Sequence, residues 1–430
     1  MTAREFIKES GLTATMEDFH RWVADFKGEM AAGLAGRPSS LRMIPTYISA
    51  ETLPRNGQSA IVLDAGGTNL RIALMEFVPG KGPKESYFNT VPMLGTRGRL
   101  TIGQFYDKLA ALIAPIAEKS RHIGFCFSFP CEILPNLDGK ILHFDKEVDI
   151  EGAAGSILGQ GLRAALERRG LPHDHRVVVI NDTVAAMLGA MAQNVGGAGD
   201  YMGFILGTGT NICASFANSD ITKVPGLSAK SGTTVINLES GGFDKLTRTA
   251  IDLVFDATTA NPGDQVLEKL ISGAYQGPMV LAYLQTARAA GVFTPAGAEG
   301  IANMTGLTAR DISHFIRDPQ APGLLHDVAQ NDADQKAVTA ILDAFFRRSA
   351  LLTAATLCAV LDATGQAKDP ERPVNIAAEG TAFYKCPLLH EYLIRDMEEL
   401  GAKTLGLYSH FVRGENPNLT GSALAALAEV

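Results

Sequence analysis

Apolar residues follow two different spacings along this chain. In several long segments they recur every three or four residues, which is the period of an α-helix. These segments are residues 16–34, 101–119, 152–169, 183–193, 334–362, 386–400 and a short final one at 422–430. Short runs of β-branched and aromatic residues predict strands, two of them within 60–77, then 123–127, 177–180, a pair beginning near 201, and 375–378. Strands and helices intermixed in this way indicate an α/β protein.

The tripeptide Gly-Thr-Asn occurs twice, each time between two apolar strands. The first copy is Gly67–Asn69 and the second is Gly209–Asn211. Glycine has no Cβ, so a Gly-rich turn at a strand end can point several backbone N–H groups into one anion-binding concavity. One such turn is weak evidence, because glycine is ordinary in hairpins. Two copies, one in each half of the chain, predict a duplicated β unit that grips a phosphate chain between its copies.

Composition excludes several classes of protein. The 430 residues are 46% hydrophobic, enough for two domains, and a net charge of −8 gives no support for a nucleic-acid partner. The five cysteines include no Cys-x-x-Cys pair, which argues against a disulfide framework and a zinc site. The N-terminus lacks the apolar core of a signal peptide, and the most apolar stretch, Ala350–Leu361, suggests a buried helix too short to span a bilayer. A soluble, cytoplasmic protein without a membrane partner is expected.

Two aspartates at strand ends are the first candidates for chemistry. Asp182 ends a buried strand, where polar side chains converge on a cleft in α/β folds, and is the best candidate for a catalytic base. The alternative is that Asp182 only caps the following helix. Asp64 precedes the first Gly-rich turn, where a carboxylate would repel phosphate unless a cation such as Mg²⁺, held partly through water, lay between them. The alternative is a turn aspartate that bonds its own backbone.

Other polar residues are less telling by themselves. Thr208, inside the second Gly-rich turn, is either a phosphate contact or a plain turn residue. Glu239 interrupts an apolar run, and carboxylates and amides suit the adjacent hydroxyls of a sugar. Lys146 is a candidate for neutralising a transferred phosphoryl group. Lys146 and Glu268 could equally be exposed surface residues, which is the usual place for charged side chains.

Six segments together resemble the hexokinase and glucokinase family. They are similar to its first phosphate motif, sugar loop, catalytic segment, second phosphate motif and two further sugar-side segments. In that order they are Leu63–Arg71, Phe125–Cys131, Asn181–Val184, Leu206–Asn211, Asn237–Glu239 and Asn261–Ile271. The match is collinear from about residue 12 to 425. It implies the α/β fold of the sugar kinase, Hsp70 and actin superfamily: a two-domain, actin-like ATPase fold, made of a duplicated ribonuclease H-like unit, with a cleft between the domains.

The resemblance also implies domains and site residues. Residues 58–182 and the C-terminal helix 420–430 would form the small domain, and residues 1–57 and 183–419 the large one. Asp182 resembles the base that takes the proton of the sugar 6-hydroxyl, with Lys146 as a second catalytic residue. The implied substrate-binding residues are Ser128, Asp145, Lys146, Asn181, Asp182, Asn211, Glu239 and Glu268. The implied cofactor-binding residues are Asp64, Gly66, Gly67, Thr68, Asn69, Arg71, Gly207, Thr208, Gly209, Gly380 and Thr381.

Three segments depart from the family pattern. The family's Trp-Thr-Lys sugar segment reads Phe144-Asp145-Lys146, which adds a carboxylate facing the expected sugar, and the aromatic residue expected after Glu239 is Ser240. The Gly/Ser-rich turn near the C-terminus reads ENPNL at 415–419. The first two departures bear on sugar preference, and the third on the adenine contacts. The chain also lacks the Cys-rich zinc loop of a different group of bacterial glucokinases.

The expected function is an ATP-dependent hexose kinase that uses Mg²⁺ and phosphorylates the 6-hydroxyl of a hexose, glucose first, feeding glycolysis. Its partners would be the small-molecule hexose and ATP. A kinase for mannose, fructose or an amino sugar stays open, because Asp145 would suit a cationic amine. A catalytically silent sugar sensor on the same fold also stays open.

Overall fold

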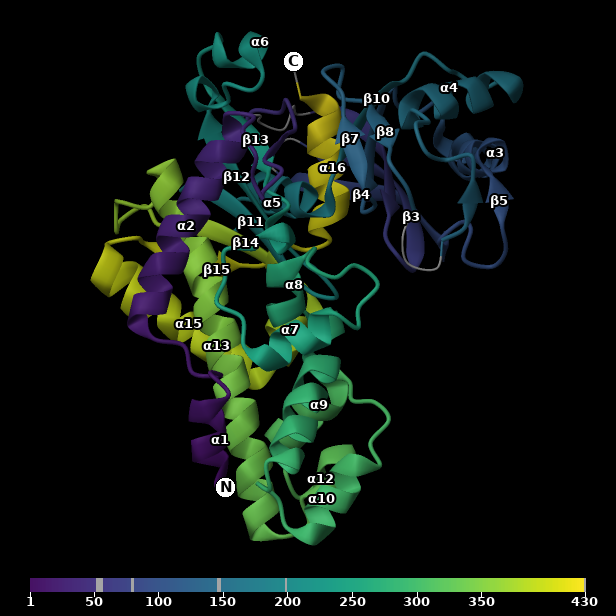
Figure 1. Ribbon diagram of the computed structural model, residues 1–430. Coiled ribbons are helices and arrows are strands. Elements are labelled where there is room, and N and C mark those ends of the chain that lie inside the picture. Colours follow the sequence, from purple (N-terminus) through teal and green to yellow (C-terminus); the bar gives the residue numbers. More distant parts are fainter. Residues whose placement is uncertain (52–56, 79–80, 145–147, 198, 429–430) are drawn as a thin grey trace.

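The framework of the molecule is a pair of β-sheets (Figure 1). The computed structural model describes residues 1–51, 57–78, 81–144, 148–197 and 199–428. The first sheet has the spatial order β10 (Arg176–Ile180), β6 (His122–Phe127), β2 (Ser59–Ala65), β3 (Asn69–Val78) and β4 (Gly82–Pro92). The second has the order β1 (Ile44–Pro45), β13 (Thr233–Asn237), β12 (Thr210–Ala217), β11 (Tyr201–Leu206), β14 (Val374–Glu379) and β15 (Ser409–Val412).

The two sheets repeat one topology. In each sheet, three consecutive strands form an antiparallel meander. A later strand pairs in parallel with the first strand of the meander, and one more strand pairs in parallel with that later strand. Strands β2, β3, β4, β6 and β10 thus correspond to β11, β12, β13, β14 and β15, and β1 extends the second sheet at β13. The predicted duplication of a β unit is confirmed. Both Gly-Thr-Asn turns join the first two strands of a meander, so they occupy equivalent places in the two sheets.

Helices cover the sheets and form a helical extension at one end of the molecule. They are α1 (Ala3–Glu9), α2 (Met16–Leu34), α3 (Ile102–Ile113), α4 (Leu158–Arg168), α5 (Asp182–Ala192), α6 (Pro225–Ser228), α7 (Ala250–Asp256), α8 (Val266–Ile271), α9 (Gly273–Ala289), α10 (Pro295–Ala302), α11 (Ala309–Arg317), α12 (Leu324–Val328), α13 (Asp332–Thr364), α14 (Thr381–Lys385), α15 (Pro387–Asp396) and α16 (Pro417–Leu427). Two short ladders pair β5 (Leu100–Thr101) with β9 (Ile150–Glu151), and β7 (Cys131–Ile133) with β8 (Gly139–Ile141). Helices α9, α10 and α12 gather at one end of α13, away from both sheets (Figure 1).

Helices α5 and α16 lie side by side between the two sheets (Figure 1). Their apolar side chains pack with Val62 of the first sheet and Val235 of the second, so both sheets share one core. The two helices approach so closely that a Cβ on Gly421 would lie 1.9 Å from the carbonyl oxygen of Ala185. Only glycine fits there, and the C-terminal helix is therefore a central part of the fold.

Three helix boundaries differ most from the prediction. The helix expected at 152–169 starts only with α4, because two glycines before it adopt positive φ and turn the chain. The helix expected to reach residue 119 ends with α3, just before Pro115, which cannot donate to a continued helix. The last helix, expected from 422, already begins at Pro417, since the fixed φ of proline suits a first helical position.

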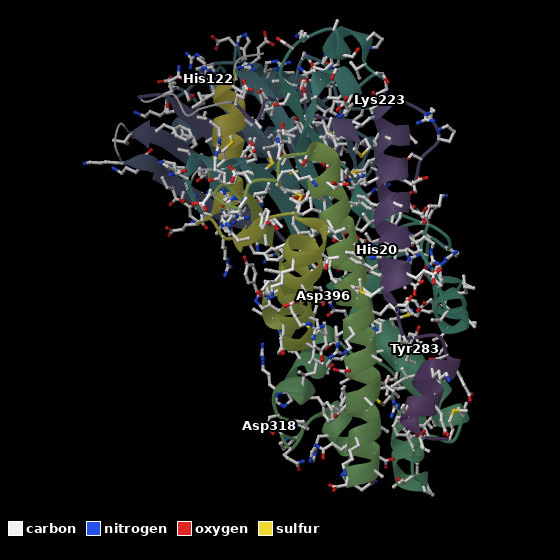
Figure 2. The ribbon with its side chains drawn as sticks, turned by 90° about the vertical axis from the view of Figure 1, so that its left-hand side faces the viewer. His20, His122, Lys223, Tyr283, Asp318 and Asp396 are labelled. Atoms are coloured by element: carbon white, nitrogen blue, oxygen red, sulfur yellow. The ribbon has the colours of Figure 1, made fainter. Side chains whose placement is uncertain are left out.

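Helix α13 contains the apolar run Ala350–Leu361 and, by length and composition alone, could cross a membrane. Within the protein, 83% of its most apolar window is buried, as in the core helix of a globular domain. Figure 2 shows α13 running beside α2 through the middle of the molecule. The prediction of a buried helix in this region is confirmed, but the expectation that it is too short to span a bilayer is wrong, because the apolar run is part of a helix of 33 residues.

Candidate active site

The first Gly-rich turn connects β2 to β3. The N–H of Gly66 donates to the carbonyl oxygen of Asn69 at 3.1 Å, which closes the turn. The backbone amides of Gly67 and Thr68 donate to no acceptor within the described part of the chain, and Thr68 and Asn69 are exposed. Amides that are fixed by a closed turn and unused by the protein are suited to bind phosphate oxygens.

Asp64 lies beneath this turn, directly opposite Arg71 in the antiparallel ladder. The Asp64 residue is 1% exposed, and its Oδ2 lies 2.5 Å from Nη2 of Arg71. Burial raises the pKa of Asp64, the Arg71 guanidinium opposes this shift, and the charge of Asp182 adds to it. Asp64 thus pairs with the neighbouring strand and is not a turn aspartate that serves only its own backbone. One partly neutralised carboxylate beside exposed amides fits Mg²⁺ held mainly by nucleotide phosphates.

The second Gly-rich turn closes in the same way as the first. The N–H of Gly207 donates to the carbonyl oxygen of Gly209 at 2.9 Å. Thr208, at the tip, is exposed, and its amide donates to no acceptor in the described residues. The structure therefore provides two equivalent amide cradles, one at each sheet.

Two glycines in this region permit close approach of neighbouring segments. A Cβ on Gly209 would lie 2.5 Å from Oε2 of Glu268, and one on Gly380 would lie 2.3 Å from the carbonyl oxygen of Leu206. Oε2 of Glu268 also accepts a hydrogen bond from the N–H of Thr210 at 3.0 Å. The structure thus brings the second turn, Glu268 and the segment of Gly380 and exposed Thr381 together.

Asp182 is the first residue of α5, and the helix is capped by its neighbour. Oδ1 of Asn181 accepts the hydrogen bond from the N–H of Thr183 at 2.8 Å, so the capping role considered for Asp182 belongs to Asn181. The half-buried carboxylate of Asp182 lies at the N-terminal end of α5, which is the positive end of the helix dipole. Burial is the main cause of the raised pKa values of Asp64 and Glu239, and the charge of Asp182 adds to both. The charge of Asp182 therefore reaches both Asp64, beneath the first Gly-rich turn, and Glu239.

Hydrogen-bonded side-chain amides connect Asn181, which precedes Asp182, to the carboxylate of Glu239. Nδ2 of Asn237 donates to Oε1 of Glu239 at 2.6 Å, and Nδ2 of Asn211 donates to Oδ1 of Asn237 at 2.6 Å. The Asn211 amide also lies 3.4 Å from Oδ1 of Asn181, and Glu239 adopts a left-handed backbone with φ of 58°. The network links the Glu239 carboxylate to three amides, those of Asn237, Asn211 and Asn181. Asn237, 5% exposed, was absent from the predicted site residues, although it begins the Asn-x-Glu motif.

Ser128 follows β6, and its N–H donates to the last carbonyl of β2 at 3.2 Å. The predicted residues Asp145 and Lys146 lie outside the described residues, so their roles stay predictions. Phe144, just before them, packs on Phe129 with ring centroids 4.9 Å apart. This contact holds the start of that segment next to the strand end that carries Ser128.

A polar pocket of about 190 Å³ lies between the two sheets, beside Arg71. Glu379 and Arg413 line it together with the turn at 414–418, which is part of the segment that departs from the family pattern. Nε of Arg413 lies 3.9 Å from Glu379, and its guanidinium stacks over Tyr384 at 4.5 Å. Burial raises the pKa of Glu379, and the Arg413 and Arg71 charges oppose the shift. Glu379 and Arg413 carried no motif in the sequence and were missed; two arginines in one pocket suit an anionic ligand.

Comparison with known proteins identifies relatives for both halves of the chain. Two family models described as hexokinase match residues 4–192 and 201–428. Hexokinase-7 of Oryza sativa subsp. japonica is 32% identical over 406 residues, which cover 84% of this chain and 82% of that protein. Hexokinase-3 of Rattus norvegicus is 30% identical over 84% of this chain, which spans only 40% of that relative's length. The hexokinase-like 1 protein of Arabidopsis thaliana is 31% identical over 96% of this chain and 88% of its own.

Solved structures share the fold. A hexokinase from Schistosoma mansoni complexed with glucose aligns over 100% of both chains, with a TM-score of 0.78 and 22% sequence identity. A likeness at this identity shows the architecture alone, and it confirms the predicted two-domain, actin-like α/β fold. The family matches over both halves and the rice relative show more: this chain belongs to the hexokinase family.

Proposed function

We propose that the protein is an ATP-dependent hexose kinase that phosphorylates the 6-hydroxyl of a hexose, with glucose as the first candidate and a glycolytic role for the product. The observation that carries this proposal is the position of Asp182. Its charge acts on Asp64 below the first amide cradle and on Glu239 in the amide network. A general base for phosphoryl transfer must lie within hydrogen-bond reach of the hydroxyl that attacks, beside the phosphate site and outside the line of attack.

In the proposed reaction, Asp182 accepts the proton of the sugar hydroxyl, and the hydroxyl oxygen attacks the γ-phosphorus in line. The free amides of Gly67, Thr68 and Thr208 donate hydrogen bonds to phosphate oxygens and stabilise charge that develops there. Mg²⁺, bound with the nucleotide, supplies further neutralisation of the phosphate charge. Asp64 is the described carboxylate that would hold it, through water.

Sugar recognition in this proposal depends on the orientation of Glu239. A carboxylate accepts from adjacent hydroxyls, and the Nδ2 of Asn181, whose Oδ1 accepts from the N–H of Thr183, can donate to another. Asn211, whose Oδ1 accepts from the N–H groups of Ile212 and Ser240, positions Asn237 by its hydrogen bond. The hydrogen bonds through Asn237 hold these groups in one arrangement before the sugar arrives. Groups fixed in advance lose little conformational entropy on binding, which favours affinity.

A coupled assay tests this function. The protein is incubated with ATP, Mg²⁺ and, separately, glucose, mannose, fructose or glucosamine, and formation of ADP is followed. We expect ADP formation that depends on the hexose. The control variant Asp182→Asn should bind the sugar in calorimetry but lose about 10²–10⁴-fold in kcat, the usual contribution of a general base. A wild-type protein that binds hexose and forms no hexose 6-phosphate would instead be a sugar sensor.

A further inference from the structure

Lys269, the residue after Glu268, is buried. Its side chain is 3% exposed, and Nζ donates to Oδ1 of Asp256 at 2.5 Å and to the carbonyl oxygen of Asn261 at 2.7 Å. The second carboxylate oxygen of Asp256 accepts from the N–H of Gly263 at 2.8 Å. The Asp256–Lys269 pair thus binds a carbonyl and an amide of one loop, which connects α7 to α8 over residues 257–265.

Burying this pair costs solvation energy, which only well-formed hydrogen bonds offset. Burial acts to raise the pKa of Asp256, but the bonds from Lys269 and Gly263 lower it below the ordinary value of 3.8. Arg248 adds a further contact at 3.2 Å to the same carboxylate. The loop has no regular secondary structure. Local turn bonds such as Asp264 N–H to the Asn261 carbonyl join neighbouring residues, whereas the bonds of the Asp256–Lys269 pair tie the loop to α7 and α8.

The loop leads directly to the sugar side of the site. Gln265 ends it in a left-handed conformation with φ of 50°, and a Cβ on Gly241, two residues after Glu239, would lie 2.8 Å from Oε1 of Gln265. Helix α8 then carries Glu268, whose carboxylate accepts from the N–H of Thr210. The loop therefore leads into the start of α8, of which Glu268 is the third residue.

A second buried ion pair on the same short helix provides a natural contrast. Asp252 of α7 accepts two hydrogen bonds from Arg348 of α13, at 2.7 and 3.0 Å, and one from the hydroxyl of Tyr283 at 2.8 Å. Figure 2 shows Tyr283 beside α13, in the helical part of the molecule. The remaining partner of Asp252 in the described chain is Thr249. The Asp252–Arg348 pair therefore joins helices and makes no hydrogen bond to the loop at 257–265.

We propose that Lys269 is a positioning residue for the hexose: through Asp256 it holds the loop at 257–265 and the start of α8, and so aims Glu268 at the substrate. The inference rests on the proposed function. A positioning role differs from a purely structural role in what replacement of Lys269 changes: it weakens sugar binding, leaves nucleotide binding unchanged, and does not act through folding alone.

Kinetics of matched variants test the proposal. Lys269→Met should raise the KM for glucose at least tenfold, with the KM for ATP within twofold of wild type. Lys269→Arg, which keeps the charge and the donors, should recover most of the glucose affinity. Arg348→Met should lower the thermal stability at least as much as Lys269→Met, yet leave the KM for glucose within twofold. All variants are compared at a temperature at which circular dichroism shows them folded.

Two further measurements keep the test decisive. If Lys269→Met does not fold, the double variant Asp256→Leu/Lys269→Met, which leaves no unpaired charge in the pair, replaces it and should regain stability without regaining glucose affinity. Amide hydrogen exchange of the peptide covering 257–265, measured without sugar, should be faster in the Lys269 variant and unchanged in Arg348→Met.

Three results would overturn the inference: an unchanged KM for glucose in folded Lys269→Met, an equal rise in Arg348→Met, or unchanged exchange in the loop. A wild-type protein that neither binds nor phosphorylates a hexose would refute the proposed function instead. In that case the exchange experiment would still decide whether Lys269 holds the loop.

Discussion

Replacing Asn237 by alanine tests whether the amide network fixes the carboxylate of Glu239. The Asn237 side chain joins Glu239 and Asn211 through two hydrogen bonds of 2.6 Å, and the residue is 5% exposed. Alanine removes both bonds and leaves the half-buried amide of Asn211 and the half-buried carboxylate of Glu239 without those partners. We expect weaker sugar binding, because Glu239 loses its fixed orientation and its pKa, already raised by burial, rises further.

The magnitude follows from the two bonds that are lost. A neutral hydrogen bond contributes about 0.5–1.5 kcal/mol and one to a charged group about 1.5–3 kcal/mol, so the two together contribute roughly 2–4.5 kcal/mol. Part of this loss lowers the free energy of unfolding, and part appears when the sugar binds. A share of about 1.4 kcal/mol in binding corresponds to a tenfold higher KM. The KM for hexose should therefore rise about tenfold or more, with a smaller change in kcat.

Asn218 offers a matched control. It is also 5% exposed, donates to the carbonyl oxygen of Ser231 at 2.9 Å and accepts from the hydroxyl of Thr234 at 2.7 Å. Asn218→Ala should lower the stability in urea or thermal unfolding by a similar amount and leave the KM for hexose unchanged. The reasoning is refuted if Asn237→Ala loses stability like the control but keeps a KM within about twofold of wild type.

Three further predictions address pH, packing and domain motion. Burial raises the pKa of Glu239 above its ordinary 4.5, so the folded protein binds this proton at a higher pH than the unfolded chain does. The stability that protonation of Glu239 provides is therefore lost as pH rises through the raised pKa. A profile of hexose KM against pH should accordingly show an acid limb above pH 4.5, which Glu239→Gln removes. Gly421→Val should destabilise the protein by about 3 kcal/mol or more in thermal unfolding, since its side chain would overlap the α5 backbone, whereas Gly28→Ala, on an exposed and open face of α2, should stabilise it by about 1 kcal/mol. Saturating glucose should reduce the radius of gyration in small-angle scattering, because the proposed sugar ligands come from both sides of residue 182; an unchanged radius with calorimetrically confirmed binding would contradict this.

The sequence by itself predicted most of the central strands, several of the helices and both Gly-rich turns. Helical and strand periods are local properties, and the need for glycine at Gly67 and Gly209 can be recognised wherever a strand ends and turns back. The repeated Gly-Thr-Asn turn therefore predicted a duplicated unit, which the matching strand orders of the two sheets confirm. The same local signals identified Asp64 and Asp182 at strand ends, and the collinear motifs identified the family. The division of the chain near residue 182 and the roles of Asp145 and Lys146 stay predictions.

Only the tertiary structure decided which residues meet and which of two neighbours has which task. Asn181, and not Asp182, caps α5, a distinction that depends on the backbone angles at the helix start. Asn237 reaches Asn211 through the pairing of β12 with β13, and Lys269 reaches Asp256 through the packing of α8 against the preceding loop. Asparagine, lysine and aspartate are usually exposed to solvent, so composition and spacing along the sequence do not indicate that these residues are hydrogen-bonded to one another. Strand register and helix packing bring such residues together, and those are set by the whole core and not by the segment in which a residue stands.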